Sequence, residues 1–146
     1  MADKLRARAE AAAAHRAVKA WLNGCEALPA GLAVSFEDLE ENAVGLCFST
    51  DQSPIYAARY ITGGYKAQYQ MQIIYRVLPS DDGDMLDAVE LLTDISAWCA
   101  ENENSLSIPG AVNVRVERTS DAAVLGVLED GTSDYGCGIT ITWEVF

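Results

Sequence analysis

Tyr65–Val77 reads YKAQYQMQIIYRV, in which every odd position is apolar and every even position except Ile74 is polar. A period of two held over these thirteen residues puts the odd positions on one face of a β-strand and a row of amides and cations on the other. At about 3.3 Å per residue the strand spans roughly 40 Å, longer than most strands of globular domains. This length indicates a strand that serves more than one small core or runs out to meet another subunit.

A hairpin turn is predicted immediately before this strand, because Gly63-Gly64 separates it from a second run of apolar and polar residues. With the two glycines as the turn, the expected cross-strand pairs are Tyr60–Ala67, Ala58–Tyr69, Tyr56–Met71, Ile61–Lys66, Arg59–Gln68 and Ala57–Gln70. One face of the hairpin is then aromatic and apolar. The other face is mostly polar and holds Arg59, Lys66, Gln68 and Gln70.

Two segments have the period of amphipathic helices. The first, Asp3–Leu22, is alanine-rich and ends at Asn23-Gly24, where the glycine is expected to form a left-handed cap. The second runs from Asp84 to Glu101 and follows an aspartate-rich turn, which suits the positive end of a helix dipole. Its expected buried stripe consists of Met85, Val89, Leu92, Ile95, Trp98 and Cys99.

The remaining segments predict strands. Short strands are expected at residues 32–36 and 44–49, before the hairpin. After residue 110 we expect three more, at 112–117, 122–128 and 138–146, with a turn at Glu129-Asp130-Gly131. Strands grouped into meanders around single helices indicate an α+β fold. We therefore predict one domain, residues 1–146, with a mostly antiparallel sheet, a long β-hairpin and two main helices, N-terminal and central, packed against the sheet.

The formal net charge of −12 is unevenly distributed along the chain. Residues 1–23 carry +3, so the rest of the chain carries −15. Phosphate backbones bind through Lys and Arg, so the acidic body is expected to repel nucleic acid. Only the first helix could attract it.

The sequence contains no residue pattern that is typical of catalysis. The four cysteines, Cys25, Cys47, Cys99 and Cys137, form no CxxC pair, which favours buried thiols in a reducing compartment over a zinc site or a disulfide framework. His15 is the one histidine, and it is expected to be a partly exposed helix residue. We predict no enzymatic activity, no cofactor, no metal, no signal peptide and no membrane span.

Several stretches together carry a resemblance to a known family. They are the run Ala111–Thr119, the Asp130-Gly131 hairpin, the closing strand Ile139–Phe146, and Gly63–Gln72 followed by a helix such as Asp84–Glu101. In this layout the chain resembles the small tail-completion proteins of bacteriophages, often labelled minor capsid proteins or tail terminators. The resemblance covers most of the chain, from the first helix to Phe146.

The resemblance implies a non-enzymatic α+β subunit of the virion tail that assembles in the host cytoplasm. Such subunits form a ring, typically a hexamer, and can be monomeric in dilute solution. The ring caps the tail tube and joins it to the head connector, so the implied partners are other copies, the tube protein and the connector protein. DNA is only passing cargo, and an acidic channel wall would let it pass because like charges do not retain phosphates.

Two groups of residues are candidates for the subunit or tube interface. Arg59, Lys66, Gln68 and Gln70 form the polar hairpin face, whose donors could meet acids on a neighbouring subunit. The second group, Asp130, Asp134 and Tyr135, falls in the glycine-flanked region from Gly126 to Gly138. That region is either a loop that orders on docking or a plain hairpin tip.

A second function class is also consistent with the sequence. A small-molecule-binding or regulatory α+β domain, dimeric through its sheet, could line an apolar pocket with Tyr56, Tyr60 and Tyr69. A stable dimer at every concentration would favour this alternative.

Overall fold

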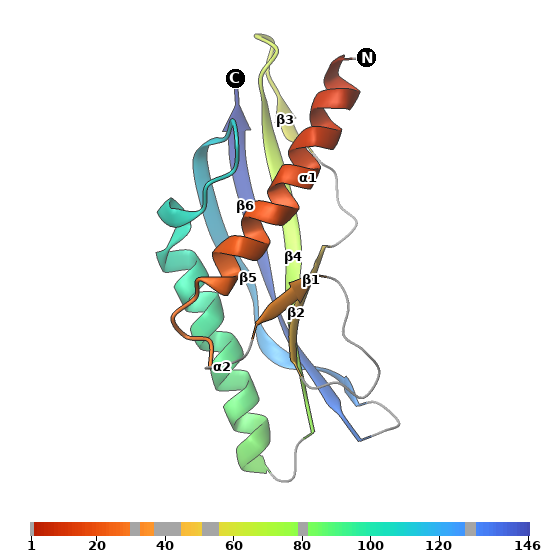
Figure 1. The fold of residues 1–146 in the computed structure, drawn as a ribbon, viewed down its shortest axis with the longest axis vertical. Helices are drawn as coiled ribbons and strands as arrows, with labels where there is room; N and C mark the ends of the chain where they lie inside the picture. The colour runs from red at the N-terminus through yellow and green to blue at the C-terminus, as the bar shows by residue number, and fades with distance from the viewer. Residues whose placement is uncertain (1, 30–32, 37–44, 51–55, 79–81, 128–130) are drawn as a thin grey trace.

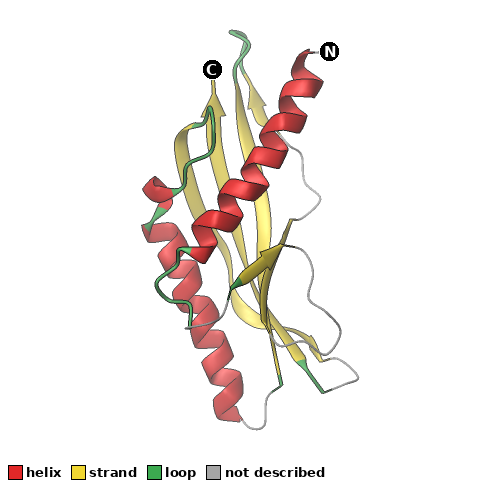
Figure 2. Cartoon of the chain, in the orientation of Figure 1, coloured by secondary structure: helices red, strands yellow, loops and turns green. Residues whose placement is uncertain are grey.

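A computed structural model describes residues 2–29, 33–36, 45–50, 56–78, 82–127 and 131–146. In these residues six strands form one sheet, and two long helices lie against one of its faces (Figures 1 and 2). The order is α1 (Ala2–Asn23), β1 (Val34–Phe36), β2 (Gly45–Thr50), β3 (Tyr56–Arg59), β4 (Tyr65–Val77), α2 (Asp82–Glu101), the 3₁₀ helix η1 (Glu103–Ser105), β5 (Val112–Val127) and β6 (Ser133–Val145). The predicted α+β fold is confirmed.

The strand β4 is the centre of the sheet and has the bounds that its alternation predicts. It pairs antiparallel with β6 in one unbroken register, from Tyr65 opposite Val145 to Val77 opposite Ser133. Its other edge is shared by β3 near the hairpin and β2 farther along. The sheet order is β1-β2-β4-β6-β5, and the β1–β2 pair is parallel. One edge of β4 is therefore long enough to pair with two different strands, β3 and β2.

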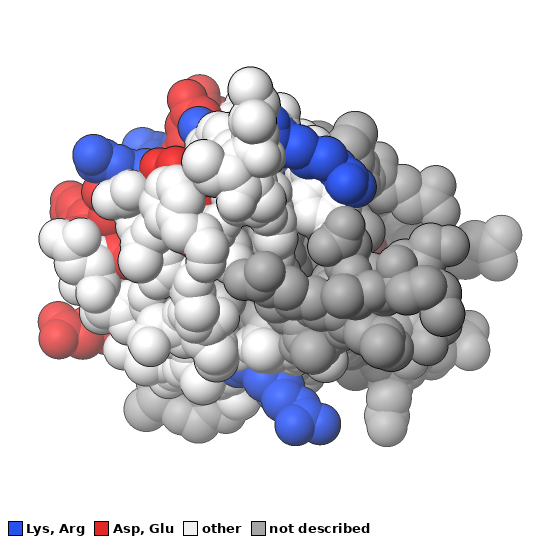
Figure 3. All heavy atoms as spheres, turned by 90° about the horizontal axis from the view of Figure 1, so that it is seen from above, with Lys and Arg blue, Asp and Glu red and all other residues white. Residues whose placement is uncertain are grey.

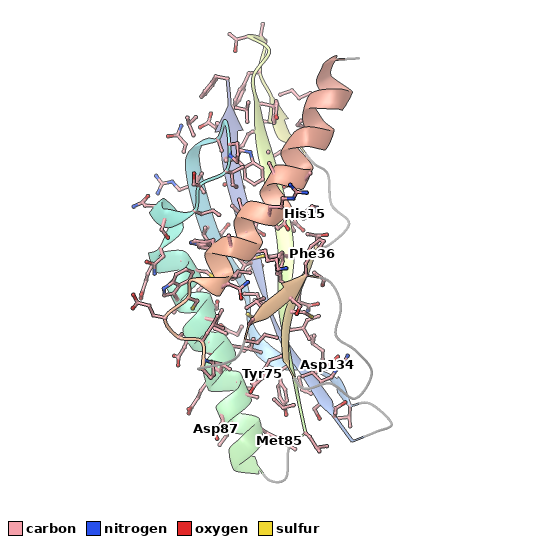
Figure 4. The ribbon with its side chains drawn as sticks, in the orientation of Figure 1. His15, Phe36, Tyr75, Met85, Asp87 and Asp134 are labelled. Atoms are coloured by element: carbon pink, nitrogen blue, oxygen red, sulfur yellow. The ribbon has the colours of Figure 1, made fainter. Side chains whose placement is uncertain are left out.

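The core lies between the sheet and the helices. The odd residues of β4 and β6 face the helices, and Ile73, Ile139 and Ile141 among them are fully buried. Leu92 and Ile95 of α2 are fully buried too, as the predicted stripe requires. Met85 is an exception, because it lies near the start of α2, at the end of the molecule, and is exposed (Figure 4).

The helix α1 packs through its second half and is tied to β1 by one side chain. Asn23 Oδ1 accepts a hydrogen bond from Val34 N–H (2.8 Å), and Asn23 Nδ2 donates to the Val34 carbonyl (3.1 Å). The predicted left-handed cap at Gly24 is wrong, since Gly24 has no positive φ. Gly24 N–H instead donates to the Trp21 carbonyl at 3.1 Å, which satisfies a terminal carbonyl by tightening the last turn.

The C-terminal part contains two strands where three were predicted. β5 is a single strand of sixteen residues. The polar stretch between its two apolar halves does not turn the chain, because register shifts near Ser120 absorb it within the strand. β6 begins at Ser133, and Gly136 and Gly138 lie inside it. A Cβ at Gly136 would lie 2.7 Å from Leu125 Cδ1, so a larger residue there would require the Leu125 side chain to shift.

Candidate functional site

The β3–β4 hairpin has a longer loop than the predicted two-residue turn. Tyr60 N–H donates to the Gly64 carbonyl (2.8 Å), and Gly63 N–H donates to the Tyr60 carbonyl (3.1 Å). Gly63 has φ +93°, which favours glycine. Gly64 is required for a different reason, because a Cβ there would lie 2.6 Å from the Val145 carbonyl oxygen. Gly63 is therefore favoured by its positive φ, whereas Gly64 is required because the Val145 carbonyl leaves no room for a Cβ.

The longer loop changes the register of the hairpin. Arg59 lies opposite Tyr65, and Tyr56 lies opposite Ala67, with an irregularity between the two pairs. The predicted pairs Arg59–Gln68 and Tyr56–Met71 are therefore wrong. An odd shift in register moves side chains to the other face of a strand pair.

Arg59 consequently does not share a face with the other three predicted interface residues. Its guanidinium carbon lies 4.3 Å from the centroid of the Tyr56 ring. Lys66, Gln68 and Gln70 do share a face, the one opposite the helices. They lie beside Glu144, Thr142 and Thr140 of β6, respectively. The predicted polar face is confirmed for these three residues and is wrong for Arg59.

The free end of the hairpin is apolar, and we call Tyr60, Ile61 and Phe146 together the hairpin end. The Phe146 ring stacks on Tyr60, with the ring centroids 6.0 Å apart. The Tyr60 hydroxyl donates to Glu144 Oε2 at 3.0 Å, and this bond to a carboxylate raises the pKa of Tyr60. Phe146 is 72% exposed, and Ile61 is fully exposed.

Asp134 and Tyr135 are not part of an exposed docking loop. Both lie in β6, where Tyr135 is buried. Asp134 forms a two-bond ion pair with Arg76 of β4, from Nε to Oδ1 (2.7 Å) and from Nη2 to Oδ2 (3.0 Å). Of the two alternatives, a loop that orders on docking is wrong for these two residues, because β6 begins at Ser133, five residues before the predicted start. Asp130 lies outside the described residues.

An open groove of about 510 Å³ lies at the opposite end of the molecule from the hairpin. Tyr75, Val77 and Leu78 line it from β4 and the residue after it, and Ala88 and Leu91 line it from α2. Asp87 adds a carboxylate (Figure 4). Pro29, after α1, lines it as well. The groove could not be predicted from the sequence, because segments that are far apart in the chain form it together.

The three tyrosines expected to line an apolar pocket, Tyr56, Tyr60 and Tyr69, each contact a different side chain. The Tyr69 hydroxyl lies 2.7 Å from Nδ1 of His15 in α1, on the helix-covered face. Tyr60 bonds Glu144, which lies on the face without helices. Tyr56 packs edge-on against Tyr65, with a centroid separation of 4.8 Å. His15 is half-buried, as expected.

The cysteines are buried and free, as the sequence predicts. Burial raises the pKa of Cys137 to about 11 and also raises the pKa of Cys99 and Cys25, which disfavours the reactive thiolate. Among the described residues, no group of three or more His, Cys, Asp or Glu side chains could hold a metal ion. No helix in the described segments is long and apolar enough to cross a membrane.

Comparisons with known proteins identify no family for this chain. No protein-family model matches it, and no curated protein does. One solved structure, whose name states no function, aligns over 100% of this chain and 97% of its own at 14% sequence identity and a TM-score of 0.42. A likeness this weak supports no conclusion about function.

Proposed function

We propose that this chain is a structural subunit of a phage or prophage tail, similar to the tail terminators. Copies of it form a ring, typically a hexamer, that caps the tail tube and joins it to the head connector. The α+β fold with a long central strand is the one that the sequence resemblance implies. The chain performs no catalysis in this role and needs no cofactor.

The observation that carries the proposal is the helix-free face of the sheet. Both long helices lie on the other face (Figure 2), so in the described part of the chain Lys66, Gln68 and Gln70 form a polar row without a helix over it, beside Thr140 and Thr142 of β6. Amide and hydroxyl groups both donate and accept hydrogen bonds. They are also less costly to remove from water than charges are. Such a face suits lasting contact with another protein surface.

The net charge of −12 supports the same role. A ring of six such subunits surrounds the path of the genome with negative charge, which does not hold phosphates. DNA can then slide past without the ring retaining it.

The test combines self-association with capping. We expect the light-scattering mass to rise from monomer toward six subunits with increasing concentration. We also expect the protein to arrest the growth of tubes assembled from the tail tube protein of the same genome. Gln70→Glu, on the helix-free face, should weaken capping, whereas Glu101→Gln, an exposed change at the end of α2, should leave it unchanged. A dimer at all concentrations, together with tubes of unaltered length, would refute the proposal.

A further inference from the structure

The two ends of the molecule's long axis differ in chemistry. The hairpin end, Tyr60, Ile61 and Phe146, lies at the same end as both chain termini (Figure 1). Viewed from above, uncharged atoms fill the middle of the described surface, and Lys, Arg, Asp and Glu side chains lie at its margins (Figure 3). Clustered exposed apolar side chains mark interaction sites more often than isolated ones do. Here Ile61 is fully exposed and Phe146 is 72% exposed.

Among the described residues, two cations next to this apolar cluster have no carboxylate within 4 Å. Beyond residue 23 the chain has five cations. Arg76, Arg115 and Arg118 each lie within 4 Å of a carboxylate. In the described part of the chain, Arg59 and Lys66 form no such ion pair. Both are exposed and flank the hairpin loop, so their charge is available to a partner.

The groove at the opposite end has complementary properties. Val77, Leu78 and Leu91 provide apolar walls, and Leu78 is 62% exposed. The helix that forms one side, α2, has six acidic residues and no Lys or Arg in its sequence. One of them, Asp87, lines the groove. An apolar projection with cations thus lies at one end, and an apolar groove beside an acidic helix lies at the other.

We propose that the hairpin end of one copy docks in the groove of a second copy. This inference rests on the proposed function, and it specifies the contact between neighbouring ring subunits. Ile61 and Phe146 enter the groove against Val77, Leu78 and Leu91. Arg59 and Lys66, on opposite faces of the hairpin, bring positive charge to the groove that the acidic helix α2 borders. Two different surfaces on each copy make the contact heterologous, so it repeats from copy to copy and closes into a ring when the rotation per copy allows.

Each part of this contact has a distinct physical role. Removal of apolar surface from water at the hairpin end and in the groove favours association. Cations facing carboxylates raise the association rate and fix the orientation, and added salt screens them. The reverse arrangement, hairpin end against hairpin end, would bring Arg59 and Lys66 of both copies together and is disfavoured by their like charge.

The experiment uses two variants of the full chain that each lose one surface. Ile61→Asp damages the hairpin end, and Leu78→Asp together with Asp87→Lys damages the groove. For each variant alone, the dissociation constant of self-association should rise by about tenfold or more. Mixed at equal concentrations, the two should form a dimer that grows no further, because each supplies the one surface that the other has lost. Val124→Asp, at an exposed apolar position on β5, is the matched control and should self-associate normally.

Circular dichroism and thermal melting of each variant establish that it is folded. Failure of the mixed variants to form the dimer, or unchanged self-association of both single-surface variants, would overturn the docking proposal. If wild-type rings still form and cap tubes in that case, the proposed function stands and the contact lies elsewhere. A wild-type chain that never exceeds a monomer and leaves tubes uncapped refutes the proposed function itself.

Discussion

Replacing Asp134 with Asn tests whether this residue supports the fold or binds a partner. Asp134 accepts two hydrogen bonds from Arg76, and the two side chains are only 18% and 16% exposed. The substitution preserves the shape and one acceptor oxygen. It removes the charge that compensates the guanidinium of Arg76.

The expected loss of stability follows from the hydrogen bonds and the burial of the Arg76–Asp134 pair. A hydrogen bond to a charged group contributes about 1.5–3 kcal/mol to stability. Truncating one partner of a fully buried ion pair costs about 3–5 kcal/mol. The residual solvent contact of this pair lowers the effect, so we expect Asp134→Asn to reduce the free energy of unfolding by about 2 kcal/mol. For a chain of this length the melting temperature should fall by roughly 4–8 °C.

The assay is a double-mutant cycle of Asp134→Asn and Arg76→Gln, followed by urea unfolding. The matched control is a second Arg–Asp pair among the described residues, Arg118 with Asp121, which is 3.8 Å apart with its carboxylate 99% exposed. Its coupling energy should stay below about 0.5 kcal/mol. If both cycles give the same small coupling energy, the Arg76–Asp134 pair does not stabilise the fold as expected. If Asp134→Asn weakens self-association at unchanged stability, Asp134 binds a partner instead.

Three further predictions concern the hairpin, α1 and the core. Gly64→Ala should destabilise the fold by about 1–3 kcal/mol in thermal melts, because its Cβ meets the Val145 carbonyl at 2.6 Å. Gly126→Ala, with nothing within 4 Å, should be nearly neutral. Asn23→Ala should cost about 2 kcal/mol in urea unfolding, because the β1 backbone loses two hydrogen bonds. The pKa of Cys137 is raised to about 11, so the unfolded chain loses this proton first and stability should fall from about pH 9 upward. Urea unfolding at pH 7–10 should show a shallower fall for Cys137→Ala, and an identical slope would contradict the assigned cause.

The sequence predicted the elements whose pattern is local. The bounds of β4 match because thirteen residues share one period and one buried face. The hairpin register could not be predicted in this way. It depends on Gly64, which approaches Val145, a residue distant in sequence. Composition predicts where the chain turns, whereas the loop length is set by what the loop packs against.

The same distinction separates the candidate site residues. Lys66, Gln68 and Gln70 share a face because they belong to one strand, and their spacing alone fixes this. Arg59 depended on the register of a second strand and was misplaced. The sequence pattern places Asp134 in a loop or hairpin tip, whereas in the structure it lies in β6, opposite Arg76. The sequence pattern pairs Ile61 with Lys66 inside the hairpin, so its exposed place at the hairpin end was not predicted and follows from the longer loop.

The long edge of β5 sets a last constraint on how copies can meet. An edge strand of sixteen residues offers unpaired backbone groups to another chain. Register shifts interrupt this edge, and Glu103 Oε2 accepts a hydrogen bond from Val116 N–H at 2.9 Å. A dimer that continued the sheet through β5 would have to displace that carboxylate and straighten the strand. A contact between copies that continued the sheet through β5 is therefore disfavoured, which agrees with the proposed contact between the hairpin end and the groove.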